Sequence, residues 1–274
     1  MPSTYTHYRF GNDVLKRLPE KQKQEIQAHR DLFSIGLHGP DLLFYYHPLT
    51  KNPVNQVGYV MHDRPGTEFF STAIEILRQK GSSAGERAYL YGFLCHFALD
   101  RECHGYIDEK IGESGVSHSE IEVELDRALL VRDRFDPLSK KLTDHIHPSR
   151  EAARVIGRFF PDIPEKKLYK AIRSMVFYNN LLCAPGKGKR QFLFFLLRIS
   201  GQYHTMRGLF INEQPNPQCA DSCEKLIRLY DSALEKAEEL LTELPENIAG
   251  RLPLNPLYRY TFGSQLLSQE EEDN

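Results

Sequence analysis

The chain has 274 residues, of which 41% are hydrophobic and 11% aromatic, and its formal net charge is −2 at pH 7. This composition is sufficient for a sizeable buried core, and the near-neutral charge gives no global reason to expect a polyanionic partner such as a nucleic acid. The densest apolar run, at 192–197, ends at Arg198 and is much shorter than a membrane-spanning helix, so we expect no transmembrane segment.

The cysteines and the start of the sequence predict a cytoplasmic protein. Cys95, Cys103, Cys183, Cys219 and Cys223 are odd in number and form no paired framework, which is typical of free thiols in a reducing compartment. The start "MPSTYTHYRF" has no basic region followed by an apolar stretch, so we expect no secretory signal.

The first part of the chain predicts helices separated by one long loop. Residues 12–36 carry apolar side chains at helical spacing, with Pro19 as a break. Residues 38–56 are rich in Pro, Asn and Gly and predict a long loop, a feature that is often functional in compact domains. Residues 66–81 predict a helix that ends at Gly81.

Helical patterns continue to the end of the chain. Residues 88–111 form a largely apolar helix, and in the next one Ser117 precedes Glu120 at the spacing of a capping box. Further helices are predicted at 149–160, 164–182, 190–203 and 220–243. Residues 184–191 predict a short basic loop without the spacing of a phosphate-binding loop, residues 251–263 a segment that packs back on the helices, and residues 264–274 a disordered tail.

No strand pattern with clean alternation is present, so the predicted fold is all-α, a multi-helix bundle formed by residues 1–274 as a single domain. The most informative helix is 88–111, because its apolar run is interrupted by His96, Asp100 and His104. Residues four positions apart lie only about 40° from one another around a helix, so these side chains form one stripe. A carboxylate among apolar neighbours is costly to bury without a partner.

A second pair with the same spacing, His118 and Glu122, lies in the next predicted helix. Two ligands four residues apart on one helix can reach the same ion, but His96 and His104 are about 12 Å apart along the axis and would need two adjacent ions. A single such pair is more often a surface pair or a satisfied core histidine. Two pairs together with His104 make a metal cluster and a buried polar network comparably good explanations.

Residues upstream add to this pattern. The complete ordered series of candidate ligands is His7, Asp41, His62, His96, Asp100, His104, His118 and Glu122. In order and local spacing the series resembles the ligands of the zinc-dependent phospholipase C family, which shares its helical fold with the single-strand-specific zinc nucleases. The resemblance covers residues 5–135, which we take as the metal-site region, with 136–263 as additional helices.

The resemblance implies three zinc sites. They would be formed by Asp41, His62, His96 and Asp100; by His104, His118 and Glu122; and by His7 with the other oxygen of Asp100. It also implies that Asp41 is the general base. Mixed nitrogen and oxygen ligation suits zinc, and manganese, iron or nickel would also be accepted.

One departure concerns the third site. In secreted members of the family an N-terminal tryptophan completes this site with its backbone amine and carbonyl, whereas this chain contains no tryptophan. We therefore expect two zinc ions, and the sequence does not decide whether the third site binds one.

The expected function is metal-dependent hydrolysis of a phosphoester by a phospholipase C-like or nuclease-like phosphodiesterase. The substrate is a small or phospholipid-like phosphoester, and nucleic acid stays open although the sequence has no basic signature for it. Phe44, Tyr45 and Tyr46 follow Asp41 and either wall the pocket or anchor the loop as core residues. Two alternatives stay open. One is an HD-type phosphohydrolase built on the adjacent pair His62 and Asp63, and the other is a non-catalytic protein stabilised by its metals.

Overall fold

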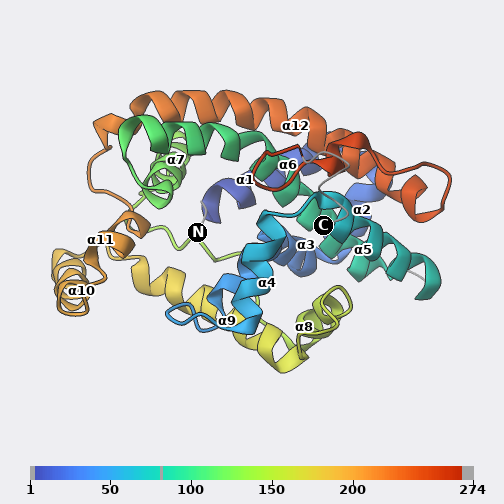
Figure 1. The fold of residues 1–274 in the computed structure, drawn as a ribbon, viewed down its shortest axis with the longest axis horizontal. Helices are drawn as coiled ribbons and strands as arrows, with labels where there is room; N and C mark the ends of the chain where they lie inside the picture. Colours follow the sequence, from blue (N-terminus) through green and yellow to red (C-terminus); the bar gives the residue numbers. More distant parts are fainter. Residues whose placement is uncertain (1–3, 81–82, 267–274) are drawn as a thin grey trace.

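The computed structural model describes residues 4–80 and 83–266 (Figure 1). Among these residues the secondary structure is helical apart from two isolated bridges, Pro65 with Thr261 and Tyr260 with Leu266. The predicted all-α class is confirmed.

The elements follow one another in this order: α1 Thr4–Arg17, α2 Glu20–Ala28, α3 Arg30–Gly36, η1 Gly39–Tyr45, α4 Pro53–His62, α5 Gly66–Lys80, α6 Ala84–Ser114, α7 His118–Arg132, α8 Arg150–Gly157, α9 Glu165–Leu182, α10 Lys187–Ile199, α11 Tyr203–Met206, η2 Arg207–Leu209, η3 Pro217–Cys219, α12 Ala220–Ile248 and η4 Pro256–Arg259.

The long helix α6 is the centre of the fold. A capping box between Ser83 and Glu86 starts it, and Gly115 ends it in the left-handed conformation at φ 70°. It packs mainly against α3 and α12, and α1 also lies against it. In the view of Figure 1, α12 runs along the top of the molecule, and α8 and α9 lie along the bottom.

Two glycines bring α3 and α6 into backbone contact. A Cβ atom on Gly92 would lie 2.2 Å from the carbonyl oxygen of Phe33, and one on Gly36 would lie 2.3 Å from that of Tyr89. Both distances are far below van der Waals contact, and the atoms met are backbone atoms that cannot rotate away. The crossing therefore requires glycine on both helices.

The N-terminal predictions need two corrections. Residues 12–36 span three helices, because α1 begins at Thr4 and Pro19 precedes α2 as its N-cap residue. The long loop predicted at 38–56 is wrong: it holds η1 and the start of α4. Asn52 caps α4 reciprocally with Asn55, so the Asn and Pro residues of this stretch start a helix as well as interrupting one.

The later elements also differ in detail. The basic loop predicted at 184–191 is wrong in its second half, since α10 begins at Lys187. Helix α12 continues through Pro245 to Ile248, because a proline in the last turn removes only one hydrogen bond of the helix. Ser117 accepts from the Glu120 N–H as expected, but the Glu120 carboxylate accepts from Asn216. The predicted helix stop at Gly81 and most of the predicted tail, residues 267–274, lie outside the described residues.

A hydrophobic cluster runs through the described chain from Tyr5 to Phe262. Segment 251–263 contributes to it with Tyr258 and Phe262, both almost fully buried, so the prediction that this segment packs back on the helices is confirmed. Phe262 also brings this segment against Phe97 of α6.

We predict that Gly92→Ala destabilises the protein by about 1–3 kcal/mol, because the added methyl group forces α3 away from α6. Gly112→Ala is the matched control on the same helix: a Cβ there meets nothing within 4 Å, and alanine favours helix over glycine by about 0.5–1 kcal/mol. Denaturant unfolding of both variants measures the difference. Equal stability of the two variants would contradict the proposed close contact.

Candidate metal centre

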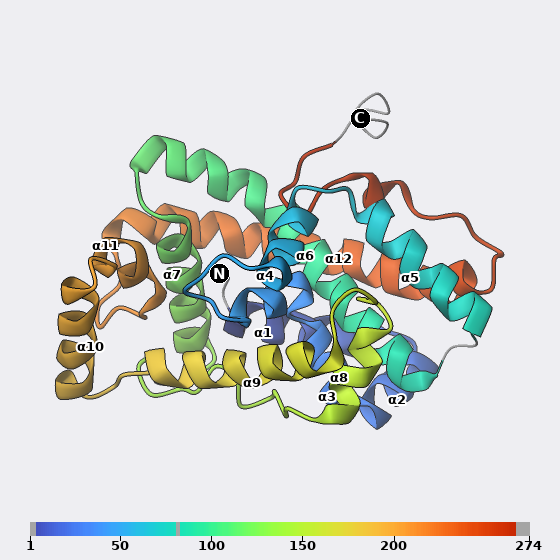
Figure 2. The same ribbon diagram turned by 60° about the horizontal axis from the view of Figure 1, so that its bottom comes forward.

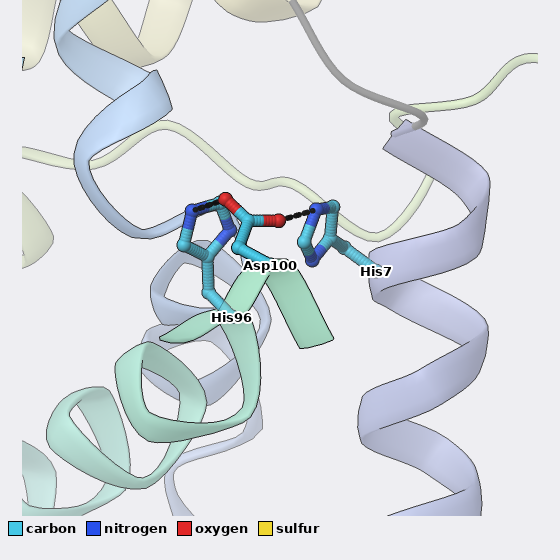
Figure 3. A group of neighbouring side chains, drawn as sticks. All are labelled: His7, His96 and Asp100. Atoms are coloured by element: carbon cyan, nitrogen blue, oxygen red, sulfur yellow. Dashed lines mark ion pairs between the residues drawn. The ribbon is translucent and has the colours of Figure 1, made fainter. Parts of the chain in front are cut away.

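The stripe predicted on α6 lies inside the protein. The exposed fractions of His96, Asp100 and His104 are 0%, 3% and 7%. His96 and His7 lie on either side of the Asp100 carboxylate, His7 reaching it from α1 (Figure 3). His96 Nε2 is 3.0 Å from Asp100 Oδ2, and His7 Nε2 is 3.1 Å from Oδ1. Each oxygen of this carboxylate thus faces a different imidazole.

Asp41 and His62 approach the same carboxylate from η1 and α4. His62 Nε2 is 3.1 Å from Asp41 Oδ1 and 3.7 Å from Asp100 Oδ2. Gly39 allows this approach: it has φ 44°, and a Cβ atom on it would lie 2.3 Å from Cδ2 of His96. Only glycine combines this backbone conformation with so close a neighbour.

The lower end of the stripe meets α7. His118 Nε2 is 3.0 Å from Glu122 Oε1, and His104 Nε2 is 3.4 Å from the same oxygen. Because Ser117 caps α7, His118 is its first residue and projects from the first turn. Its side chain is 39% exposed, so this group faces solvent through His118.

All eight residues predicted from the sequence are thus brought together. Their ligand atoms form three groups, each with atoms within 4.8 Å of one another: His7, His96 and Asp100; Asp41, His62 and His96; and His104, His118 and Glu122. The sequence assigned His96 to one ion, whereas in the structure this residue belongs to two of the groups.

Backbone carbonyls orient two of the imidazoles. His62 Nδ1 lies 2.7 Å from the carbonyl oxygen of Gly58, and His104 Nδ1 lies 2.9 Å from that of Phe262. Donation from Nδ1 to the carbonyl leaves Nε2 as the free electron-pair donor, the usual arrangement behind a metal-binding histidine. Sequence reasoning missed both partners. Gly58 lies four residues before His62 on the same helix, so helical spacing could have predicted this partner. Phe262 lies far from His104 in the sequence, and only the fold brings the two together.

Asp126 is a further residue that sequence reasoning missed. Its carboxylate accepts hydrogen bonds from the backbone N–H groups of Tyr5 and Thr6 and from the Thr6 hydroxyl, at 2.7–3.0 Å. These N–H groups belong to the first turn of α1, where no carbonyl of the same helix can satisfy them. Asp126 lies on α7, one helical turn after the candidate ligand Glu122. It therefore holds the start of α1, the helix that carries His7.

The cluster contains more buried acceptors than the described residues satisfy. Buried atoms without a hydrogen-bond partner in the described chain include both oxygens of Asp41, Asp100 Oδ2, Glu122 Oε2, His7 Nδ1 and both ring nitrogens of His96. A buried polar atom without a partner is costly. Ligand atoms about 2.0–2.2 Å from a tetrahedral zinc lie about 3.3 Å apart, close to the spacings found here. The residues present fit divalent metal ions.

The electrostatics of the metal-free cluster favour protonated imidazoles and ionised carboxylates. Burial lowers the pKa of His62, but the neighbouring carboxylates of Asp100 and Asp41 outweigh it and raise that pKa to about 10. For His104, burial likewise opposes Asp100 and Glu122, which raise its pKa to about 9. Burial raises the pKa of Asp100, yet the surrounding imidazoles hold it well below its usual range.

The remaining candidate residues lie outside the three groups. His145 is paired with His38 at 2.8 Å and His147 with Asp31 at 3.0 Å. Asp63 is exposed at the end of α4 and belongs to none of the groups, so the adjacent His–Asp pair of the HD-type alternative is not assembled. The five cysteines are free.

The aromatic residues after Asp41 divide between site and core. Phe44 stacks on His62 with ring centroids 5.3 Å apart, so it borders the metal centre. Tyr45 is buried and its hydroxyl accepts from the Asn179 side chain, which makes it a core residue. Tyr46 is half-buried beside Lys170.

These features define an all-α protein with a buried centre of imidazoles and carboxylates suited to metal ions. The family model described as zinc dependent phospholipase C matches residues 6–173, more than half of the chain. The chain belongs to this family, as its sequence led us to expect, and membership indicates a zinc-dependent hydrolase. Neither the comparison with curated proteins nor that with solved structures gives a match. In the described part of the chain, no helix has the length and apolar character needed to cross a membrane.

We predict that Asp100→Asn removes most of the bound metal, because Asp100 faces the imidazoles of all three groups, whereas Glu122→Gln removes the ion of one group only. Glu102→Gln is the matched control, since Glu102 is a largely buried carboxylate of the same helix that pairs with Lys236 instead. Elemental analysis of the purified variants measures the metal content. Equal losses in all three variants would argue against the cluster.

We also predict that zinc binding releases protons. In the metal-free protein, His62 and His104 have raised pKa values and hold protons at about pH 8, whereas zinc requires neutral imidazoles. Zinc affinity therefore rises with pH up to the range of these pKa values. Titration calorimetry in buffers of different ionisation enthalpy measures the protons released, and an affinity independent of pH between about 7 and 9 would contradict the prediction.

Proposed function

We propose that this protein is a zinc-dependent phosphodiesterase of the phospholipase C type. The observation that supports this best is the position of Asp100, whose two oxygens face four imidazoles from α1, α4 and α6 in the protein interior. A purely structural network would need far fewer ligand groups to satisfy one carboxylate.

The distances favour one division of the ligands among ions. Asp100 Oδ2 faces His96 and His62, which supports a first site of Asp41, His62, His96 and Asp100. His104, His118 and Glu122 would hold a second ion. His7 faces the other oxygen of Asp100, which supports a third site of these two residues. We expect zinc in the first two sites, and manganese, iron or nickel could replace it.

Bound zinc would lower the pKa of water and neutralise negative charge on the phosphoryl oxygens. Asp41 supplies the base. One of its oxygens lies beside His62, while Oδ2 has no partner among the described residues and can accept a proton from the attacking water. His62 and Asp41 are held by α4 and η1, so their relative position is fixed before substrate arrives.

The surroundings of His62 favour a lipid phosphodiester. Phe44 stacks on both Tyr59 and His62, and Tyr59 and Val60 of α4 are half exposed. Leu49, just before α4, is also exposed. Apolar side chains around a charged centre suit a substrate with a phosphate group and hydrocarbon chains.

We further propose that residues 5–135 and the helices that follow act as one domain. The family match crosses residue 135 and extends to 173, and α9 packs against η1, which carries Asp41. The additional helices thus support the metal centre directly.

We predict that Asp41→Asn lowers turnover of a phosphodiester by about 10²–10⁴-fold, the usual contribution of a general base. Release of p-nitrophenol from p-nitrophenylphosphocholine measures turnover, and the zinc content of each preparation is determined in parallel. Asp63→Asn is the matched control, because Asp63 is exposed and lies near the site without joining it.

Full turnover by Asp41→Asn with zinc retained would remove Asp41 from the role of base. If Asp41→Asn loses its zinc, Asp41→Glu with zinc bound provides the test, since it keeps a carboxylate but moves it by one methylene group. Wild-type protein that binds zinc and hydrolyses no phosphodiester would overturn the proposed activity and leave a metal-stabilised protein.

A further inference from the structure

One stretch of the chain has an unusual charge. Residues 166–212 contain no Asp or Glu, although the whole chain has a net charge of −2. The same stretch contains nine basic residues: Lys166, Lys167, Lys170, Arg173, Lys187, Lys189, Arg190, Arg198 and Arg207. Most of it, including all of α10, lies beyond the part matched by the family. Positive charge is therefore concentrated on α9, α10 and the segment after them.

Helix α10 exposes its apolar side to solvent. Phe192, Phe195, Leu196 and Ile199 have exposed fractions of 59%, 56%, 44% and 69%. Their spacing of three, four and seven residues places them on one face of the helix. A helix on the surface of a globular protein normally turns such a face toward the core.

The inward side of α10 is held by other contacts. Arg190 is buried, and its guanidinium donates to the carbonyl oxygen of Ile211 at 2.7 Å. Phe194 packs edge-on against Phe210 with centroids 5.0 Å apart, and Arg207 lies over the Phe194 ring. The orientation of α10 is thus fixed with a cation inward and the apolar face outward.

We propose that α10 docks on the surface of a phospholipid bilayer that contains anionic lipids. An apolar face flanked by cations is the pattern of helices that lie in the plane of a membrane interface. Lys187 and Lys189 are exposed at the start of the helix and Arg198 near its end. Figure 2 shows α10 at the extreme edge of the molecule, where a flat surface can reach it.

Two other partners for this surface of α10, a second copy of the chain and a nucleic acid, fit less well. In a two-fold dimer the same basic segment of both copies would meet itself, which brings like charges together. Nucleic acid would match the charge, but Leu196 and Ile199 are aliphatic and cannot stack on bases. A bilayer satisfies both the charge and the apolar side chains.

This inference deepens the proposed function, because a phospholipase C must reach substrate in a membrane, and to that extent it rests on that proposal. The binding step itself needs no turnover and can be measured separately. Docking by α10 would add a lipid-surface requirement that hydrolysis of a small dissolved phosphodiester does not have.

The test is cosedimentation of the zinc-loaded full chain with vesicles of phosphatidylcholine, with and without an equal part of phosphatidylserine. We expect binding to the anionic vesicles that weakens with added salt. The triple variant Phe192→Ser, Phe195→Ser, Ile199→Ser should lose about tenfold or more in affinity, because each of the three native side chains would bury apolar area in the bilayer and serine would not. Val131→Ser, at a similarly exposed site on α7, is the matched control.

A second variant tests the contribution of the basic side chains to vesicle binding. Lys187→Glu with Lys189→Gln should weaken binding to the anionic vesicles, whereas Lys225→Glu, exposed on α12, should not. Hydrolysis of p-nitrophenylphosphocholine should be unchanged in every variant, which shows that they fold and separates a failure of docking from a failure of the proposed activity.

The absence of wild-type binding to anionic vesicles would overturn the proposal, as would equal binding by the triple variant. So would a wild-type dimer that the triple variant dissociates without any effect on vesicle binding, because α10 would then be a contact between copies. Binding of single-stranded RNA in place of vesicles would likewise overturn it.

Discussion

The buried carboxylate of Asp100 is the constraint on which the rest of the structure depends. A charge at this depth is stable only with several partners around it, and these come from α1, α4 and its own helix. The imidazoles are in turn held by carbonyls and capped helices, so the ends of α1, α4 and α7 are fixed at one place. The packing of these helices and the assembly of the metal centre therefore depend on each other, because both require the buried polar groups to find partners inside an apolar core.

The metal centre and the basic, apolar helix α10 are two chemically different regions that lie apart in the structure. The centre of the molecule holds the candidate ligands, with Phe44 and Tyr59 beside His62 at its border. The basic, apolar α10 lies at the periphery and outside the family match. The family match includes the central cluster but not α10, and surface elements can differ between relatives because surface residues change at little cost to the core.

Several sequence predictions were wrong for an identifiable physical reason. The loop expected at 38–56 became a 3₁₀ helix and the start of α4, because Asn52 and Pro53 act as helix-start residues when the following chain can pack. Prediction of that packing required Tyr45 to be assigned to the core, which local composition does not reveal. The basic residues at 187–190 were similarly taken for a loop although they begin α10.

The sequence by itself determined the all-α class, the family and the stripe on α6, since helical periodicity and ligand spacing are local properties of the chain. The resemblance seen in the sequence already implied that Asp100 faces His7 and His62. Only the tertiary structure decided that His96 belongs to two groups and that the carbonyl of Phe262 orients His104 from 158 residues away. It alone decided that the apolar face of α10 points outward, because periodicity defines a face of a helix but does not say what covers it. These contacts join segments distant in sequence, and their positions follow from the packing of the whole core.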